Sequence, residues 1–302
     1  MDTYYNLCFV INDNYVGQFK VTFYSIFLNN KDKKFNINII ESDLSNESKN
    51  DLTLFISQLG SIINFIDVDN SWFTNASHMA TDSSYTTYYK IFIFKYLINL
   101  DRVLYLDCDM VVNNDIDELY NYNTDKLLCA VIDREVNKCN RRYLSKIINK
   151  NTNYFNAGML LFNFTDENRK LIDLELIKNY LLNESSNLQM HDQDVFNHFF
   201  NENCTFISNK YNYFTLYHYL YQFFIPIPHN KKPTIIHYVG FKPWKGDYVG
   251  FFKNKYIAYY KETSKVTNIN FLEKTNHIGR IKKYFILWRT KLHRLFNRIF
   301  HL

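Results

Sequence analysis

The sequence predicts an α/β fold with a mostly parallel sheet covered by helices on both faces, followed by a basic helical tail. Short apolar runs alternate with amphipathic segments from residue 7 to residue 106, as in sheets built from parallel strands. A length of 302 residues with 47% hydrophobic content allows one sizeable core. Residues 274–302 contain eight Lys or Arg and no Asp or Glu. We therefore expect one domain over residues 1–270 and a separate tail over residues 271–302.

The expected strands and helices follow in order along the chain. The first part comprises a strand at Leu7–Ile11, a helix at Val16–Leu28, a strand at Phe35–Ile40, a helix at Ser45–Gln58 closing at Gly60, a strand at Ile62–Val68 and helical spacing over Thr86–Ile98. The second part comprises strands at Val103–Leu106, Leu127–Ile132, Gly158–Phe162 and Thr234–Ile236, and helices at Leu171–Leu182 and Val195–Phe200. We expect an irregular aromatic loop at Tyr211–Pro228.

Composition excludes several classes of protein. Without the tail the chain has 27 basic and 30 acidic residues, so its body does not resemble a nucleic-acid binder. The cysteine count is odd and lacks framework spacing, which favours a reducing compartment. No stretch approaches the roughly 18 uninterrupted apolar residues of a membrane span, and the N-terminus lacks a signal-peptide pattern. We therefore expect a cytoplasmic protein.

Two carboxylates follow a buried strand at Arg102–Val112. Asp107 and Asp109 are separated by Cys108, and side chains two apart on an extended backbone point the same way. Both carboxylates could reach one hard cation at the carboxyl edge of the sheet, where ligands of open α/β folds bind. A pair of Asp residues is common by chance, and the apolar strand in front of it strengthens the interpretation.

A histidine occupies a similar position at the end of the last expected strand. His237 begins the segment HYVGFKPW, and an imidazole there could complete the site of the two carboxylates. Oxygen ligands with one nitrogen suit Mn²⁺ or Mg²⁺ better than Zn²⁺. Gly240 permits close approach of a ligand, and Lys242 could reach a phosphate. For a lone histidine, a structural role at the sheet edge is the commoner one.

Two further segments carry polar side chains beside apolar ones. In FNAG, Asn156 can bond sugar hydroxyls while Ala157 leaves room against the backbone, although the segment could equally be a turn. In HDQD, Asp192 can cap the following helix, with Gln193 and Asp194 in its first turn. Because one acid suffices as a cap, at least one of these side chains is expected to face a cleft.

Together these motifs resemble retaining glycosyltransferases of family 8, the group of glycogenin and of bacterial lipopolysaccharide galactosyl- and glucosyltransferases. The matches run in family order from Phe9 to Trp244, and they include Asn12–Tyr15, TTYYK at Thr86–Lys90, LDCD at Leu106–Asp109, FNAG, DQD and HYVG followed by KPW. The resemblance implies a single Rossmann-like nucleotide-sugar-binding domain of the GT-A type that uses a divalent metal, usually Mn²⁺.

The resemblance also implies roles for residues of this chain. Asp107, Asp109 and His237 would ligate the metal, which holds the diphosphate of UDP-galactose or UDP-glucose. The remaining expected donor contacts are Asn12, Asn14 and Tyr15 at uracil and ribose, Cys108 beside the metal ligands, Lys90 and Asp133 near the sugar or diphosphate, Asn156, Ala157, Asp192 and Gln193 at the transferred sugar, and Gly240 and Lys242 at the phosphates. Retention needs either a carboxylate nucleophile, for which Asp192 is the candidate, or same-face attack with Gln193 supporting the cation.

This sequence departs from the family pattern at two places. The common spacing is HxxGxxKPW, whereas only Phe241 separates Gly240 from Lys242 here, so the reach of Lys242 is open. Asn12 stands where the family usually has an aspartate after the first strand, although Asp13 follows it directly.

The tail has the pattern of a basic amphipathic helix. Its apolar residues recur at helical spacing, namely Ile281, Phe285, Trp288, Leu292, Leu295, Ile299 and Leu302, and basic residues lie opposite or beside them. Such a helix suits an anionic membrane surface, and we expect residues 278–302 to contact the inner face of the cell membrane, as fits a glycolipid acceptor. A helix docked on its own domain, or one that binds a calmodulin-like partner, is the alternative.

Two other functions remain possible on sequence grounds. A strand ending in Asp-x-Asp also occurs in haloacid-dehalogenase-like phosphohydrolases, where Asp107 would be the nucleophile. The chain could also be a non-catalytic, membrane-bound module that binds sugar nucleotides or glycans. Release of phosphate from simple esters would support the first, and metal-dependent UDP binding without turnover would support the second.

Overall fold

The fold is built on a central seven-stranded sheet with the strand order β3-β2-β1-β4-β7-β6-β8. In this computed structural model the described residues are 4–69, 85–139, 141–149, 151–215 and 232–299. The strands are β1 (Tyr4–Val10), β2 (Lys34–Glu41), β3 (Ile62–Asp67), β4 (Arg102–Leu106), β6 (Leu128–Ile132), β7 (Phe155–Asn163) and β8 (Cys204–Phe206). The β1–β2, β2–β3, β1–β4 and β6–β8 pairs are parallel, whereas β7 runs antiparallel to both of its neighbours.

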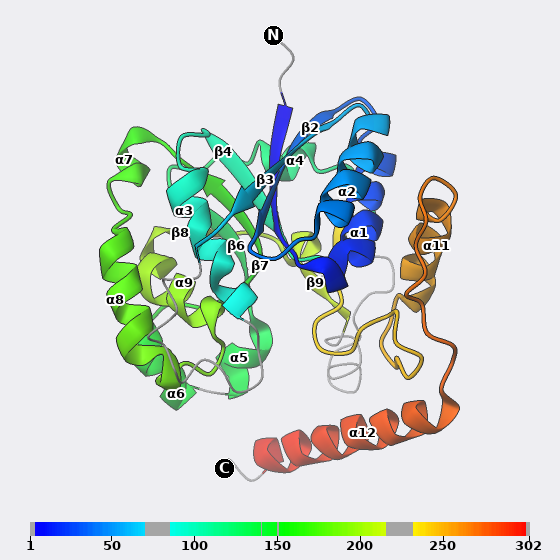
Figure 1. The fold of residues 1–302 in the computed structure, drawn as a ribbon. Coiled ribbons are helices and arrows are strands. Elements are labelled where there is room, and N and C mark those ends of the chain that lie inside the picture. Colours follow the sequence, from blue (N-terminus) through cyan, green and yellow to red (C-terminus); the bar gives the residue numbers. More distant parts are fainter. Residues whose placement is uncertain (1–3, 70–84, 140, 150, 216–231, 300–302) are drawn as a thin grey trace.

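Helices cover both faces of this sheet (Figure 1). On one side lie α1 (Val16–Asn29) and α2 (Asn46–Gln58); on the other lie α3 (Ile93–Tyr96), α8 (Leu174–Glu184) and α9 (Asp192–Phe200). Alternation along β4 supplies both cores, because Val103 and Tyr105 pack with the second group while Leu104 and Leu106 pack with the first. The shorter elements are η1 (Asp13–Tyr15), η3 (Tyr85–Phe92), α4 (Asp117–Tyr120), α5 (Arg134–Cys139), α6 (Arg141–Ile147), α7 (Asp166–Arg169), η4 (Ser185–Asn187), η5 (Asn201–Asn203) and η6 (Asn209–Tyr211).

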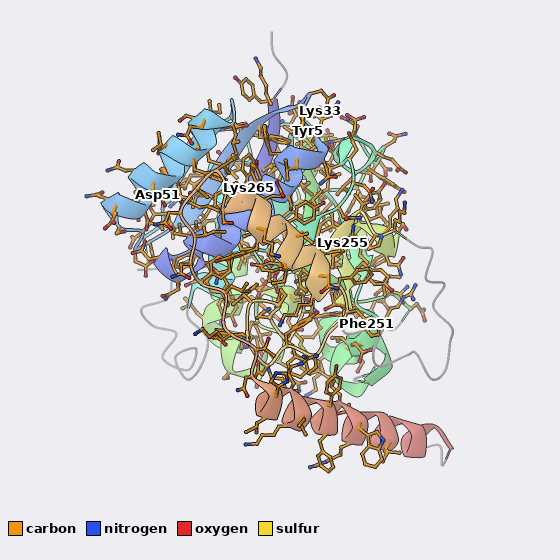
Figure 2. The ribbon with its side chains drawn as sticks, turned by 90° about the vertical axis from the view of Figure 1, so that its right-hand side faces the viewer. Tyr5, Lys33, Asp51, Phe251, Lys255 and Lys265 are labelled. Carbon is orange, nitrogen blue, oxygen red and sulfur yellow. The ribbon has the colours of Figure 1, made fainter. Side chains whose placement is uncertain are left out.

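A small second sheet lies beside the carboxyl ends of the central strands. It consists of β5 (Met110–Val112), β10 (Ile235–His237) and β9 (Tyr213–Phe214), in the order β5-β10-β9. Helix α11 (Lys253–Thr263) packs near it through a third apolar cluster that includes Val111, Ile236, Trp244 and Tyr256. Figure 2 shows α11, where Lys255 is labelled, crossing in front of α1.

The last helix, α12 (His277–Ile299), lies apart from the body of the molecule (Figures 1 and 2). An ion pair from Lys283 to Asp247 at 2.7 Å ties it to the preceding loop, and Leu287 is buried. Its outer face keeps an apolar stripe in solvent, with Ile281 68%, Phe285 64% and Trp288 53% exposed. Within the described ranges, no helix is both long and apolar enough to cross a bilayer.

The predicted α/β architecture is confirmed, and its errors are local. The segment Thr86–Ile98 is mostly 3-10 helix, the expected strand at Gly158–Phe162 begins earlier, at Phe155, and part of the expected aromatic loop forms β9. Residues 216–228 of that loop lie outside the described residues. Strand β8 and helix α11 are not predicted from the sequence, because β8 is too short to show periodicity and α11 has little apolar contrast between its faces. Cys8, Cys108, Cys129 and Cys204 are free and buried.

Candidate functional site

The turn between β4 and β5 places both aspartates at the junction of the two sheets. The amide of Asp107 donates to the Gly158 carbonyl at 2.8 Å, which extends the β4–β7 ladder by one residue. The carbonyl of Asp109 accepts from the amide of Tyr238 at 2.9 Å, which ties it to the β10 end. From α1, the buried hydroxyl of Thr22 lies 2.9 Å from the carbonyls of Cys108 and Met110. The turn is therefore fixed by three elements distant in sequence.

His237 joins the two aspartates through strand pairing. It lies opposite Met110 in the antiparallel β5–β10 pair. Its Nε2 is 3.1 Å from Asp109 Oδ1 and 3.8 Å from Asp107 Oδ2. One ligand atom from each of these three residues lies within 4.8 Å of the others.

The chemistry of this cluster fits a divalent ion. Two carboxylates and one imidazole form the oxygen-rich donor set that suits Mn²⁺ or Mg²⁺. Gly158 leaves the space beside it open, since a Cβ there would lie 2.5 Å from His237 Cε1 and 2.7 Å from Asp107 Oδ2. The absence of a side chain at residue 158 is therefore a condition for these two ligands to approach each other.

Lys242 reaches the cluster despite its shortened spacing from Gly240. Its ammonium donates to Asp109 Oδ2 and, at 3.3 Å, to the Tyr238 carbonyl. Burial raises the pKa of Asp109, but Lys242 and His237 outweigh burial and hold that pKa well below its usual value. Asp109 is therefore ionised, as a metal ligand requires.

A second lysine joins Asp107 to Asp192. Lys90 Nζ lies 2.7 Å from Asp192 Oδ2 and 3.6 Å from Asp107 Oδ1, and it donates to the Ala157 carbonyl at 3.1 Å. Burial lowers the pKa of Lys90, but the two carboxylates outweigh it and raise the pKa, so the ammonium stays charged. Burial raises the pKa of Asp192, and Lys90 offsets only part of that effect. The hydroxyl of Tyr105 donates to Asp107 Oδ1 at 2.7 Å.

These side chains line a cavity of about 290 Å³ at the carboxyl edge of the sheet. Its walls include eight of the predicted residues, namely Asn12, Tyr15, Lys90, Asp107, Cys108, Asp109, Asp192 and Lys242. Val10, Ile11, Thr86, Thr87 and Tyr105 complete the lining. The lining thus combines apolar side chains with convergent charges, as ligand sites do.

The predicted amide residues form a network behind the ion cluster. Asn156 Nδ2 and the amide of Ala157 both donate to Gln193 Oε1, at 2.7 and 3.1 Å. Gln193 Nε2 donates to Asp133 Oδ2 at 3.3 Å. Asp133 also caps α5 by accepting from the amides of Glu135 and Val136. The structure therefore groups these four predicted residues, from β7, α9 and the end of β6.

The remaining predicted residues lie around the mouth of the site. Asn12 caps the 3-10 turn η1 by accepting from the amide of Asn14 at 3.2 Å, and Asn14 itself is exposed. Gly240 has φ +78°, a backbone conformation that favours glycine. Burial raises the pKa of Cys108 well above its usual value, so its thiol is inert.

One sequence interpretation is wrong. Asp192 does not cap α9: it is the first residue of that helix, the N-cap is His191 with φ 51°, and no side chain caps the terminus. The buried Lys90 ammonium binds the Asp192 carboxylate instead. Asp194 is likewise no cavity residue, since it accepts from Tyr154 and Tyr143 in the core.

Sequence reasoning also missed site residues. Asn212 and Thr22 contact the cluster without belonging to any motif, and Tyr105 contacts it from the strand before Asp107. Asn212 has no local signal, because asparagine is abundant in this chain and this one lies in the segment expected to be irregular.

Comparison with known proteins agrees with the resemblance. The family model described as glycosyl transferase family 8 matches residues 6–247. A putative glycosyltransferase of Haemophilus influenzae is 28% identical over 69% of this chain and 63% of its own length, so the chain spans less than two thirds of that relative. A lipopolysaccharide 1,3-galactosyltransferase of Salmonella typhimurium is 25% identical, over 80% of this chain and 73% of its own length.

A solved structure has the same fold. The galactosyltransferase LgtC, in complex with donor and acceptor sugar analogs, aligns with a TM-score of 0.75 at 23% identity, over 88% of this chain and 97% of that chain. At this identity the likeness concerns the fold.

Proposed function

The chain belongs to glycosyl transferase family 8, and on this premise we propose that it is a metal-dependent retaining hexosyltransferase. It moves galactose or glucose from a UDP-sugar to a saccharide acceptor. The observation that carries this proposal is the convergence of Asp107, Asp109 and His237 beside a cavity that also contains two lysine ammonium groups. The catalytic domain spans residues 1–270.

Charge balance explains why such a cavity needs a cation. The carboxylates of Asp107, Asp109 and Asp192 exceed the ammonium groups of Lys90 and Lys242 by one negative charge. A diphosphate would be repelled by that sum, whereas a bound divalent ion reverses its sign. When bound, Mn²⁺ (or Mg²⁺) supplies Lewis-acid stabilisation of the charge on the departing diphosphate. Asp107, Asp109 and His237 would hold it.

We assign the donor contacts from the family resemblance, and the positions of Asn12, Tyr15, Lys90, Asp192 and Lys242 in the cavity lining support the assignment. Asn12, Asn14 and Tyr15, at the end of β1, bind uracil and ribose. Gly240 and Lys242 bind the diphosphate, where Lys242 exchanges its contact with Asp109 for one with phosphate oxygen. The residues assigned to the sugar side are Lys90, Asp133, Asn156, Ala157, Asp192 and Gln193.

Retention of configuration requires a group on the sugar face opposite the leaving group, or attack from the leaving-group side. Asp192 is our candidate nucleophile because its carboxylate lines the cavity and is oriented by Lys90. Gln193 supports the cation less directly, since its carbonyl already accepts from Asn156 and Ala157. In same-face attack, Asp192 and Lys90 would instead orient the sugar.

The acceptor is assigned to a surface glycolipid such as lipopolysaccharide or lipooligosaccharide. The support is the exposed stripe of Ile281, Phe285 and Trp288 on α12, flanked by the exposed basic side chains of Lys282 and Arg289. An anionic bilayer satisfies both faces, because apolar rings enter the acyl boundary while basic side chains meet headgroups. We propose that residues 271–302 hold the enzyme on the inner face of the cell membrane.

Donor hydrolysis tests this function without knowledge of the acceptor. The protein is incubated with UDP-galactose or UDP-glucose, with and without Mn²⁺, and UDP and inorganic phosphate are quantified. We expect UDP release that requires Mn²⁺ and disappears in Asp109→Ala, while circular dichroism shows that the fold survives. The exposed carboxylate of Asp101 provides the matched control, Asp101→Ala.

Other results would favour the other functions. A fully active Asp109→Ala variant contradicts the proposal. Phosphate release from simple esters would favour the phosphohydrolase. Mn²⁺-dependent UDP binding without hydrolysis or transfer would favour the binding module.

A further inference from the structure

A chain of side-chain amides connects the ion cluster to the residues assigned to the sugar. His237 Nδ1 lies 2.8 Å from Asn212 Oδ1, and Asn212 Nδ2 lies 2.8 Å from Asn156 Oδ1. Asn156 in turn donates to Gln193. Asn212 is fully buried at 0% exposure, between η6 and β9.

Two backbone donors fix the direction of every hydrogen bond in this chain. The amide of Gly158 donates to Asn156 Oδ1 at 2.9 Å, and the amide of Ala157 donates to Gln193 Oε1 at 3.1 Å. A backbone N–H can only donate, so the Asn156 atom that faces Asn212 must be its oxygen. Asn212 therefore turns its NH₂ group toward Asn156 and its carbonyl toward His237.

The orientation of Asn212 sets the tautomer of His237. Since a carbonyl oxygen only accepts, Nδ1 of His237 must carry the hydrogen of that contact. Nε2 is then the ring nitrogen that faces Asp109 and Asp107, at 3.1 and 3.8 Å. With an ion bound between them, the lone pair of Nε2 and those of the two carboxylates would all point to that ion.

The buried side chain of Asn30, away from the site, shows a different pattern. The side chain of Asn30 donates to the Ile26 carbonyl and accepts from the Ile116 amide, so it stabilises backbone. The hydrogen bonds of the Asn212 side chain go to two side chains of the site. Its role is therefore distinct from that of an asparagine that stabilises the fold.

We propose that Asn212 is a positioning residue that holds His237 in its metal-binding tautomer and couples it to Asn156 and Gln193. This inference rests on the proposed function, since it assumes that the cluster binds a divalent ion. Partners of this kind behind a metal-ligating histidine typically contribute about 10- to 100-fold in metal affinity.

Two variants separate the two hydrogen bonds. Asn212→Leu removes both, and Asn212→Asp keeps an acceptor for His237 Nδ1–H but faces Asn156 Oδ1 with a second acceptor. Mn²⁺ is titrated into the full chain with saturating UDP, and free Mn²⁺ is followed by its electron paramagnetic resonance signal. We expect the Kd for Mn²⁺ to rise about 10- to 100-fold in the Leu variant and to stay within about threefold in the Asp variant.

Donor hydrolysis gives the second readout. In Asn212→Asp we expect kcat for UDP-sugar hydrolysis to fall by about 10-fold or more, because the new acceptor repels Asn156 Oδ1 and displaces Asn156 together with the Gln193 bonded to it. Asn30→Leu is the matched control, which lowers Tm and leaves the Mn²⁺ affinity unchanged. Should the Leu variant fail to fold, Asn212→Ser replaces it with the same expected rise in Kd, since a serine hydroxyl is too short to hold both contacts.

The remaining outcomes overturn the inference in distinguishable ways. Wild-type protein that binds no Mn²⁺ overturns the proposed function, and this inference with it. Wild-type binding that is unchanged in the Leu variant overturns the inference alone. Equal weakening in the Leu and Asp variants contradicts the role of Asn212 as the acceptor for His237.

Discussion

The edge of the sheet where Asp107, Asp109 and His237 lie is enclosed by other elements, whereas helix α12 leaves large apolar side chains in solvent. At the edge, β4 pairs with a strand on each side and β5 pairs with β10, and the polar groups of the turn are bound by α1, β7 and the end of β10. On α12, the ion pair to Asp247 and the buried Leu287 face the body, while large apolar side chains stay in solvent.

The chain's own contacts complete the geometry of the ion cluster, whereas they leave the apolar stripe of α12 uncovered. Asp107, Asp109 and His237 are held close together by strand pairing and backbone hydrogen bonds, so most of the ordering cost of the site is met by folding. The α12 stripe has no comparable partner among the described residues, which fits a surface that functions only against another phase.

The largest effect is expected from filling the gap at Gly158. In Gly158→Ala the new Cβ would overlap His237 and Asp107, so we expect Mn²⁺ affinity to fall by at least about 100-fold and donor hydrolysis to be lost. Mn²⁺ titration measures the first effect. Gly60→Ala is the control: it has open space but φ +69°, so it should lose about 1 kcal/mol of stability and keep its Mn²⁺ affinity. Normal Mn²⁺ binding by the Gly158 variant would show that the space is not required.

The next largest effect is expected on membrane binding, from changes confined to the apolar stripe of α12. Replacing Ile281, Phe285 and Trp288 together by Ser should weaken binding to anionic vesicles about 100-fold, because it forfeits on the order of 3 kcal/mol of apolar burial. UDP-sugar hydrolysis in solution should not change. Vesicle co-sedimentation measures the difference, and deletion of residues 276–302 gives its upper limit. Sedimentation that survives this deletion would refute the membrane role.

Replacing Lys242 tests the charge balance among the carboxylates and ammonium groups of the site. In Lys242→Met we expect the affinity for UDP to fall about 10-fold or more, the scale of a charge-assisted hydrogen bond. Mn²⁺ affinity without UDP should not fall, because Lys242 competes with the ion for Asp109. Calorimetric titration of each ligand gives both values. A parallel loss of Mn²⁺ affinity would mean that Lys242 organises the cluster instead.

The smallest effect provides a baseline away from both regions. Tyr5 and Lys33, labelled in Figure 2, both contact the carboxylate of Asp117. The Tyr5 hydroxyl donates a hydrogen bond to it, the Lys33 ammonium lies 3.0 Å away, and both lower the pKa of Asp117. A lowered carboxyl pKa stabilises the fold above the unfolded-state pKa near 4, and the gain is lost as pH falls through the lower, folded-state pKa. Asp117→Asn should therefore cost less than about 1 kcal/mol at pH 7, and progressively less as pH falls below about 4, as urea unfolding can measure. A cost that is independent of pH would contradict this electrostatic origin.

Much of the fold and of the ion cluster could be predicted because local patterns carried them. Alternating apolar runs gave the strands, and Asp107, Asp109 and His237 each follow such a run. What could not be predicted depends on contacts between distant segments. The antiparallel direction of β7 has no local signature in the sequence. The same holds for Asp192, whose carboxylate pairs with Lys90 instead of capping α9. The link from Asn212 to His237 exists only once β9 pairs with β10.

The most direct test of the central claim is a crystal structure of the protein grown with Mn²⁺ and UDP, with diffraction collected at the manganese absorption edge. We expect one anomalous peak about 2.0–2.4 Å from oxygens of Asp107 and Asp109 and from Nε2 of His237, in contact with the diphosphate. UDP bound with no peak at these three residues, or with the ion held elsewhere, would contradict it.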